Sequence, residues 1–129
     1  MCSSDLYVAD TEPARLWAFD IESPGVARKQ GWPSPHGGRI IAGLGGFQRF
    51  DSLAVEASGN VAVATLHAGC ITVIAPNGSV VRQVAMPDEF PTNICFGGPD
   101  LRTAYVTLSA TGRLGALDWA EPGLRLNFT

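Results

Sequence analysis

Three segments of the chain can be laid over one another without a gap, and this internal repeat limits the possible folds more than any other feature. They are LYVADTEPARLWAFD from Leu6, VAVATLHAGCITVIA from Val61 and AYVTLSATGRLGALD from Ala104. Each begins as an apolar or alternating strand, passes through a few small or polar residues and resumes as a second strand. The starts are 55 and then 43 residues apart, close to the roughly 40–50 residues of common repeats built from four strands. The sequence therefore predicts an array of similar β-sheet units.

The segments between the repeats complete each unit. DSLAVEASGN precedes the second repeat and TNICFGGPDLRT precedes the third, and both read as a short strand followed by a turn. After the second repeat, Asn77-Gly78 lies between two apolar runs, which is a strong hairpin signal. Helix signals are nearly absent, because the best candidate, MPDEFPTN, is interrupted by Pro87 and Pro91. The fold class is therefore all-β, and a unit of four antiparallel strands is a blade of a β-propeller.

The number of units is too small for a closed propeller, which typically has about four to eight blades. Residues 1–129 supply about two and a half to three blades, and LYVADT corresponds to the second strand of a unit. We therefore expect residues 1–129 to be the C-terminal part of a single propeller domain. The opening residues 1–6, MCSSDL, resemble the translation of a sequencing-library adapter and are expected to be a non-native leader. An open half-ring would leave apolar blade faces uncovered, so we expect self-association.

Composition excludes several classes of protein. With 46% apolar and 16% charged residues the chain is not of a disordered type, and its net charge of −3 gives no general attraction to nucleic acid or anionic membranes. Apolar runs are too short to span a bilayer, and the first residues lack the pattern of a secretory signal. We therefore expect no nucleic-acid partner, no membrane insertion and a cytoplasmic location.

Three blocks carry a family resemblance. LYVADTEPARLWAFDI, FDSLAVEASGNVAVATLHAGCITVIAPNGSVV and TNICFGGPDLRTAYVT resemble the C-terminal half of the gluconolactonase family, which includes senescence marker protein (regucalcin) and the luciferin-regenerating enzymes. The resemblance covers nearly the whole chain, and the third block is its most specific part. It implies a propeller of six blades that hydrolyses sugar lactones with a divalent metal ion in its central channel. Calcium or zinc is the expected ion, with magnesium or manganese also compatible with oxygen ligands.

Asp51 is the main candidate site residue. From the residues alone, an aspartate before the short strand Leu53–Val55 is either a cap on the preceding turn or a ligand. The resemblance implies the second role, because the family pattern is Asp, Gly, a short apolar strand and a Gly-Asn turn. Asp51 would then be a metal ligand and a possible catalytic carboxylate acting on water. Ser52 departs from the pattern at its Gly, and the family's other ligands, a Glu and an Asn, have no counterpart in this chain.

Thr92 and Asn93 stand before the strand Ile94–Phe96 in the place that Asp51 occupies before its own strand. We expect one of them to face the channel, where it could hydrogen-bond the substrate or support the metal ligand. The alternative is a turn cap for the inner strand. His67, in a Gly-containing loop, is expected to be solvated, although it could lie at the edge of a pocket.

Two classes of function remain after these arguments. The first is a metal-dependent lactonase whose partner is a small-molecule sugar lactone; the isolated chain would be inactive because it carries one metal ligand of the family's three. The second is a propeller that binds or scaffolds without catalysis, since a fold does not determine a function. The oligomeric state is left open by the sequence.

Overall fold

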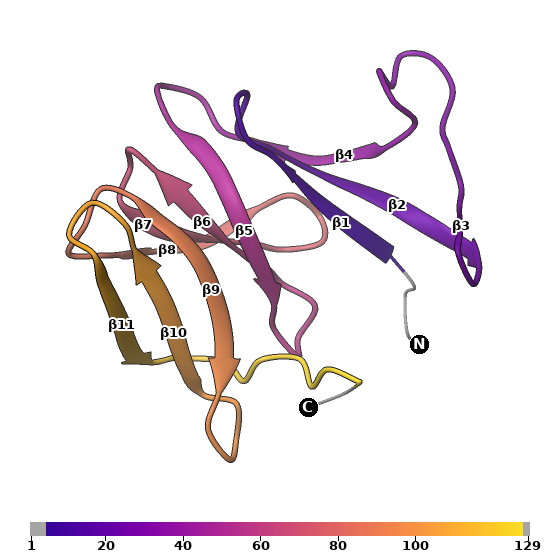
Figure 1. The fold of residues 1–129 in the computed structure, drawn as a ribbon. Helices are drawn as coiled ribbons and strands as arrows, with labels where there is room; N and C mark the ends of the chain where they lie inside the picture. The colour runs from indigo at the N-terminus through magenta and orange to yellow at the C-terminus, as the bar shows by residue number, and fades with distance from the viewer. Residues whose placement is uncertain (1–4, 128–129) are drawn as a thin grey trace.

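The computed structural model describes residues 5–127, which form eleven strands and no helix. Figure 1 shows three antiparallel sheets that lie side by side in chain order, from the indigo N-terminal strands to the orange strands. The three gapless repeats are the strand pairs β1–β2, β6–β7 and β10–β11, as the sequence predicted. Most of the leader expected over residues 1–6 lies outside the described residues, but Asp5 and Leu6 belong to β1.

The second sheet is a complete four-stranded unit. Its strands pair in sequence order, and they are β5 (Arg49–Val55), β6 (Val61–Leu66), β7 (Cys70–Ile74) and β8 (Val80–Ala85). The predicted Asn77-Gly78 hairpin joins the last two strands, with Gly78 at a φ of 91°, a conformation that glycine adopts without a steric cost. This sheet has the predicted order of strand, turn, strand, loop, strand, turn, strand.

The flanking sheets have the same antiparallel pattern. In the first sheet β2 (Arg15–Ser23) pairs with β1 (Asp5–Asp10), with the short β3 (Val26–Ala27) and with β4 (Arg39–Gly43). In the third sheet β10 (Thr103–Leu108) lies between β9 (Pro91–Gly97) and β11 (Arg113–Asp118). Strands β5 and β9 are therefore the first strands of two successive units, and they pack beside one another.

Two apolar layers hold the three sheets together. Residues of β6 alternate between them: Val61 and Val63 face the first sheet, and Ala62 and Ala64 face the third. All four are at most 1% exposed, which explains why the segment VAVA carries no polar residue. Burial of apolar side chains on both faces of the central sheet stabilises the fold. Within residues 5–127, no segment is a helix with the length and hydropathy needed to cross a membrane.

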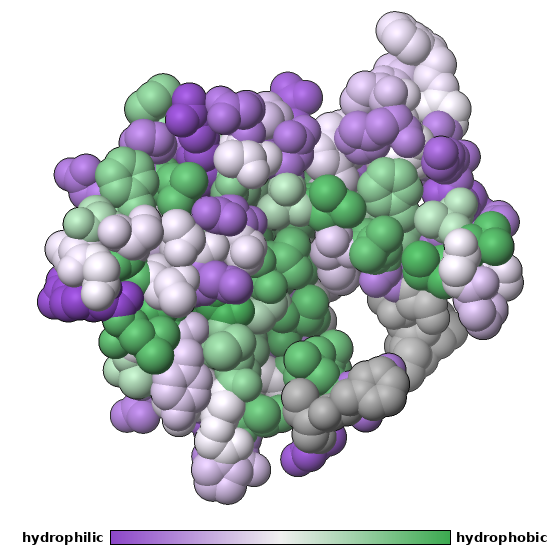
Figure 2. Space-filling model, viewed as in Figure 1, coloured by the Kyte–Doolittle hydropathy of each residue, from purple (hydrophilic) through white to green (hydrophobic). Residues whose placement is uncertain are grey.

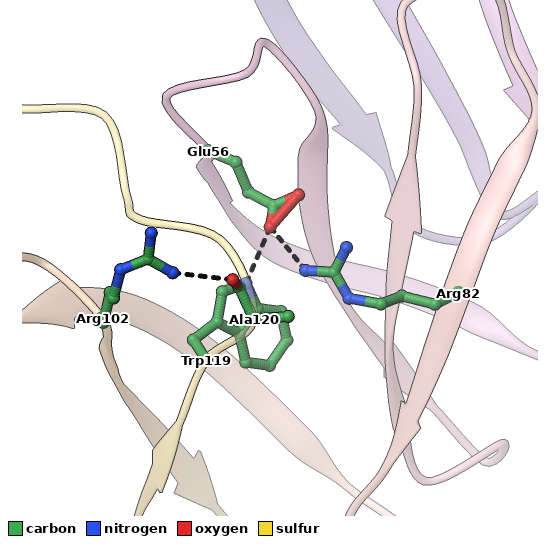
Figure 3. A network of polar contacts seen from close by, with 5 residues as sticks. All are labelled: Glu56, Arg82, Arg102, Trp119 and Ala120. Carbon is green, nitrogen blue, oxygen red and sulfur yellow. Dashed lines mark hydrogen bonds and ion pairs between the residues drawn. The ribbon is translucent and has the colours of Figure 1, made fainter.

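A buried polar cluster joins the second sheet to the C-terminal segment (Figure 3). The fully buried carboxylate of Glu56, just after β5, accepts hydrogen bonds at Oε2 from Arg82 Nη2 at 2.5 Å and from Trp119 Nε1 at 2.9 Å. Beside it, Arg102 donates to the carbonyl of Ala120 at 2.8 Å. Because Arg82 comes from β8 and Trp119 from the segment after β11, their bonds to Glu56 fix the end of β5 opposite to the end where Asp51 lies.

Candidate functional site

Asp51 lies in a β-bulge near the start of β5. Phe50 pairs with Thr65 and Leu53 pairs with Val63, so Asp51 and Ser52 together stand opposite the single residue Ala64. A bulge of this kind bends the strand and changes the direction of its side chains, and bulges are frequent beside functional sites. It also allows Phe50 and Leu53, three residues apart, to pack against the same apolar layer.

The side chain of Asp51 is partly buried and, among residues 5–127, makes no hydrogen bond or ion pair. In the turn-cap alternative the carboxylate accepts a hydrogen bond from a neighbouring backbone amide, and residues 5–127 contain no such bond. The carboxylate is therefore free to accept a ligand.

Thr92 and Asn93 occupy the corresponding bulge in β9. Pro91 pairs with Leu108 and Asn93 with Thr107, and the register shifts between these two pairs. The hydroxyls of Thr92 and Thr107 are 2.8 Å apart and share a hydrogen bond, so Thr92 already has a partner within its own sheet. Asn93 is exposed, and its Oδ1 accepts a hydrogen bond of 2.8 Å from the amide of Ile94, as in the capping alternative.

Sequence reasoning missed the aromatic group at this end of the sheets. His67, in the β6–β7 turn, was expected to be solvated, but it is half-buried between the rings of Phe47 and Phe90, with centroid distances of 4.6 and 5.1 Å. Its φ of 68° lies in the left-handed region, and its amide donates to the carbonyl of Glu89 at 2.9 Å. Because Leu66 pairs with Arg49, this turn lies at the same end of β5 as Asp51. The alternation of apolar residues along the strands does not predict which loop residues contact one another.

A second group at this end involves Asp88, which fastens the β8–β9 connection to the β10–β11 turn. Its Oδ1 accepts from the amide of Phe90 at 2.7 Å, and its Oδ2 accepts from the hydroxyl and amide of Thr111 at 2.7 and 2.9 Å. The hydrogen bond from the Thr111 hydroxyl is the main reason why the pKa of Asp88 is lowered from its ordinary value. This carboxylate is committed to the fold and is not free to bind a ligand.

An apolar cavity of about 630 Å³ runs along the later parts of β5 and β9. Its lining includes Leu53, Val55, Phe96, Leu124 and Leu126. Figure 2 shows apolar side chains gathered in the middle of this face, over β5. Neither Asp51 nor Thr92 lines the cavity, so the candidate ligand lies next to this apolar volume and not within it.

The chemistry of the described residues fits part of a metal centre. A carboxylate oxygen is a preferred ligand of calcium and other hard divalent cations, and Asp51 has one available. Such cations need several oxygen ligands, however, and residues 5–127 contain no group of three His, Cys, Asp or Glu side chains placed to hold one. Asp51 would therefore supply one ligand of a site that needs others.

Comparison with solved structures identifies the fold. A luciferin-regenerating enzyme superimposes with a TM-score of 0.75 at 19% identity, over 94% of this chain and 43% of that one. A calcium-binding protein, regucalcin from Agrobacterium tumefaciens, superimposes with a TM-score of 0.74 at 19% identity, over 95% of this chain and 46% of that one. The three sheets are therefore blades of a β-propeller, as the repeat predicted.

Comparison of sequences identifies the family. Residues 3–110 match the family described as the SMP-30/Gluconolactonase/LRE-like region, and the chain belongs to this family. It is similar to 6-deoxy-6-sulfogluconolactonase from Pseudomonas putida, with 30% identity over 122 residues, which cover 86% of this chain and 41% of that protein. The chain thus spans less than half the length of this relative.

Proposed function

We propose that the protein to which this chain belongs is a lactonase that uses a divalent metal ion to hydrolyse a sugar lactone. The observation that carries the proposal is the carboxylate of Asp51, which is partly buried, has no partner within residues 5–127 and lies in the bulge of β5. Support for the reaction comes from membership of the gluconolactonase family and from the lactonase among its relatives. Support for a metal comes from the structural neighbour described as a calcium-binding protein.

In this proposal Asp51 has two possible tasks. One carboxylate oxygen would hold a divalent cation, which when bound supplies Lewis acidity toward a lactone carbonyl and lowers the pKa of water. The other oxygen could accept a proton from the attacking water, as a general base does. The hydroxyls of Thr92 and Thr107 share one hydrogen bond, which leaves one hydroxyl proton free to donate to a substrate oxygen.

The rim beside Asp51 is suited to the apolar face of a sugar ring. Phe47 is 76% exposed and packs against His67, so this end of the sheets presents an aromatic surface to solvent. Arg49 lies over the Phe47 ring, 5.4 Å from its centroid, and pairs with Glu12 at 3.1 Å. These contacts orient the ring and keep it open on one side.

The experiment that tests the function uses the longer protein that contains this chain. Asp51→Asn keeps the size of the side chain but removes its charge. We expect kcat/KM for gluconolactone to fall about 100-fold, the upper end of the loss that follows when a residue supporting a metal site is changed. The matched control is Asp118→Asn, which changes an exposed carboxylate at the end of β11. Full activity of the Asp51→Asn protein would contradict the proposal. For the isolated 129-residue chain we expect no appreciable turnover with calcium or zinc.

A scaffold without catalysis is the second candidate. It is favoured by one observation, that residues 5–127 hold no group of three potential metal-ligating side chains. The two candidates differ in the sequence upstream of this chain. An early Glu, and an Asn that begins the inner strand before LYVAD, would complete a ligand set with Asp51 and support the enzyme, whereas their absence would support the scaffold.

A further inference from the structure

His67 lies between the segments that lead into the two strands with the candidate site residues. Phe47 precedes Asp51 in the loop that enters β5, and Phe90 precedes Thr92 directly before β9. The imidazole of His67 packs against both phenyl rings, at centroid distances of 4.6 and 5.1 Å. Figure 1 shows the β6–β7 turn at the same end of the array as the starts of β5 and β9. The imidazole therefore connects the entrances of both strands.

Backbone contacts hold the β6–β7 turn in this place. The amide of His67 donates to the carbonyl of Glu89 at 2.9 Å, and the amide of Met86 donates to the carbonyl of Gly69 at 2.8 Å. Both bonds join the turn to the connection between β8 and β9. The φ of His67 is 68°, in the left-handed region, which a residue other than glycine keeps only where surrounding contacts stabilise it. The imidazole is therefore attached to a fixed part of the backbone.

The ring nitrogens of His67 are available to a ligand. The side chain is half-buried, and within residues 5–127 its nitrogens make no hydrogen bond or ion pair. His36, the other histidine of the chain, differs, because its Nδ1 accepts a hydrogen bond of 3.2 Å from the amide of Gly38. A neutral imidazole has one N–H donor and one acceptor nitrogen. In His67 the two phenyl rings orient the imidazole, so neither nitrogen is used for that purpose.

The separation of His67 from Asp51 follows from the register of β5 and β6. Asp51 stands in the bulge opposite Ala64, and His67 follows Ala64 by three residues, just beyond the end of β6. Three residues of a strand span about 10 Å. The backbone of His67 is therefore displaced from Asp51 by about that length along the strand. A side chain so placed reaches a different part of a small ligand from the atom that meets Asp51.

We propose that His67 is a specificity-determining residue whose imidazole hydrogen-bonds the ring hydroxyls of a sugar lactone. The inference rests on the proposed function and adds which part of the substrate is recognised. With the lactone carbonyl at Asp51, the hydroxyls on the opposite side of the ring point toward the β6–β7 turn. Hydroxyls both donate and accept hydrogen bonds, as a neutral imidazole does. A site built to hydrogen-bond a hydroxyl discriminates against the analogue that lacks it.

The first measurement uses the longer protein and compares two lactones with the same ring. The ring of δ-gluconolactone carries hydroxyls, and that of δ-valerolactone carries none. His67→Phe keeps a ring between Phe47 and Phe90 but removes both nitrogens. We expect kcat/KM for δ-gluconolactone to fall about tenfold, mainly through KM, and kcat/KM for δ-valerolactone to change less than about twofold.

The control is His36→Phe, which removes the other imidazole of the chain, packed against Trp17 in the first sheet. It should leave the kinetics of both lactones unchanged. Equal losses for both lactones in His67→Phe would assign His67 to the chemical step or to the fold, and no loss for either would separate it from the substrate. Either result would overturn the proposal. Should His67→Phe not fold, His67→Gly gives the same comparison, because glycine readily adopts a φ of 68°.

A binding measurement separates this inference from the lactonase function. Methyl β-glucoside has a ring with hydroxyls but no carbonyl, so it binds without reacting as a lactone. In the NMR spectrum of the longer protein, the imidazole signal that is missing from His67→Phe belongs to His67. We expect methyl β-glucoside to shift this signal, and tetrahydropyran, a ring of the same size without hydroxyls, to leave it in place. A shift without hydrolysis of δ-gluconolactone would support the His67 contact and contradict the lactonase reaction. No shift would overturn the inference, whether or not the lactone is hydrolysed.

Discussion

Asp51 and Thr92 occupy the same position in β5 and β9, the first strands of two successive sheets. Each residue follows a buried side chain, Phe50 or Pro91, and each begins a bulge of the ladder to the next strand. The two strands differ in whether the side chain at the bulge has a hydrogen-bond partner. Thr92 shares its hydrogen bond with Thr107, whereas the carboxylate of Asp51 has no partner within residues 5–127. The repeat therefore supplies two equivalent positions, of which one is satisfied within its own sheet and the other has no partner among the described residues.

The first prediction concerns the stability cost of Asp51. Because the carboxylate makes no hydrogen bond in the described part of the chain, Asp51→Asn should lower the free energy of unfolding by less than about 0.5 kcal/mol, or raise it. If Asp51 were a capping residue, Asp51→Asn would weaken its hydrogen bond and lower the free energy of unfolding by about 1 kcal/mol. Urea denaturation of the parent and the variant at the same protein concentration distinguishes the two. A clear loss would identify Asp51 as a cap.

The second prediction concerns Ser52, where the family pattern has glycine. Ser52 lies within β5 and is not among the residues with positive φ, so serine fits this backbone without strain. The backbone at this position therefore does not require the glycine of the family pattern. Ser52→Gly should lower the free energy of unfolding by about 0.5–1 kcal/mol through the greater freedom of the unfolded chain. A stabilised Ser52→Gly variant would show that the bulge does prefer glycine.

Local patterns predicted most of the strands but few of the contacts between loops. Each repeat specifies a strand, a turn and a second strand through residues close in sequence, and Asn77-Gly78 specifies a hairpin on its own. Strand β4, in contrast, lies within the glycine-rich segment GGRIIAGLGG, and only its pairing with β2 makes it a strand. The position of His67 between two phenylalanine rings depends on loops from separate units, which no local pattern describes.

Local sequence patterns likewise predicted only part of the candidate site and its surroundings. Asp51 was found because the strand and turn that follow it are contiguous, and its bulge could have been inferred from the three-residue spacing of Phe50 and Leu53. The role of Glu56 could not be inferred, because its partners Arg82 and Trp119 lie 26 and 63 residues away. The exposure of Cys95, on the face of the third sheet that points away from the second sheet, could not be inferred either. Its exposure depends on whether another sheet packs on that face, which the local sequence does not specify.

The third prediction concerns acid stability and Asp88. Its pKa is lowered mainly by the hydrogen bond from the Thr111 hydroxyl, so the ionised carboxylate stabilises the folded state. This contribution is complete above the ordinary aspartate pKa of about 3.9 and is lost as the pH falls through the lower folded value. Asp88→Asn should therefore melt at a lower temperature at pH 7 and lose less stability below about pH 4. Melting curves from pH 7 to pH 3 test this.

The control for this pH dependence is Asp118→Asn, which changes an exposed carboxylate on β11. It should keep both the melting temperature at pH 7 and the acid slope of the parent chain. An Asp88→Asn variant whose acid slope equals that of the parent would contradict the role given to the Thr111 contact.

The fourth prediction concerns the buried ion pair of Glu56 and Arg82. The carboxylate of Glu56 is fully buried, and the side chain of Arg82 is 26% exposed. Removal of one partner leaves a buried charge without compensation, so Arg82→Met should lower the free energy of unfolding by about 3 kcal/mol. Glu56→Gln in the same chain removes that charge and should restore part of the loss. Trp119 Nε1 still has a carbonyl oxygen to donate to in the double variant, because glutamine keeps an acceptor near Oε2.

The double-mutant cycle provides the measurement for this pair. Urea denaturation of the parent, the two single variants and the double variant isolates the coupling between Glu56 and Arg82, which should exceed about 1 kcal/mol and favour the pair. A matched pair on the surface, Arg28 and Glu22, has side chains that are 62% and 45% exposed and should give a coupling of at most about 0.5 kcal/mol. If the two coupling energies were equal, burial would not strengthen the Glu56–Arg82 interaction. Glu56 would then not be the residue that fixes the end of β5.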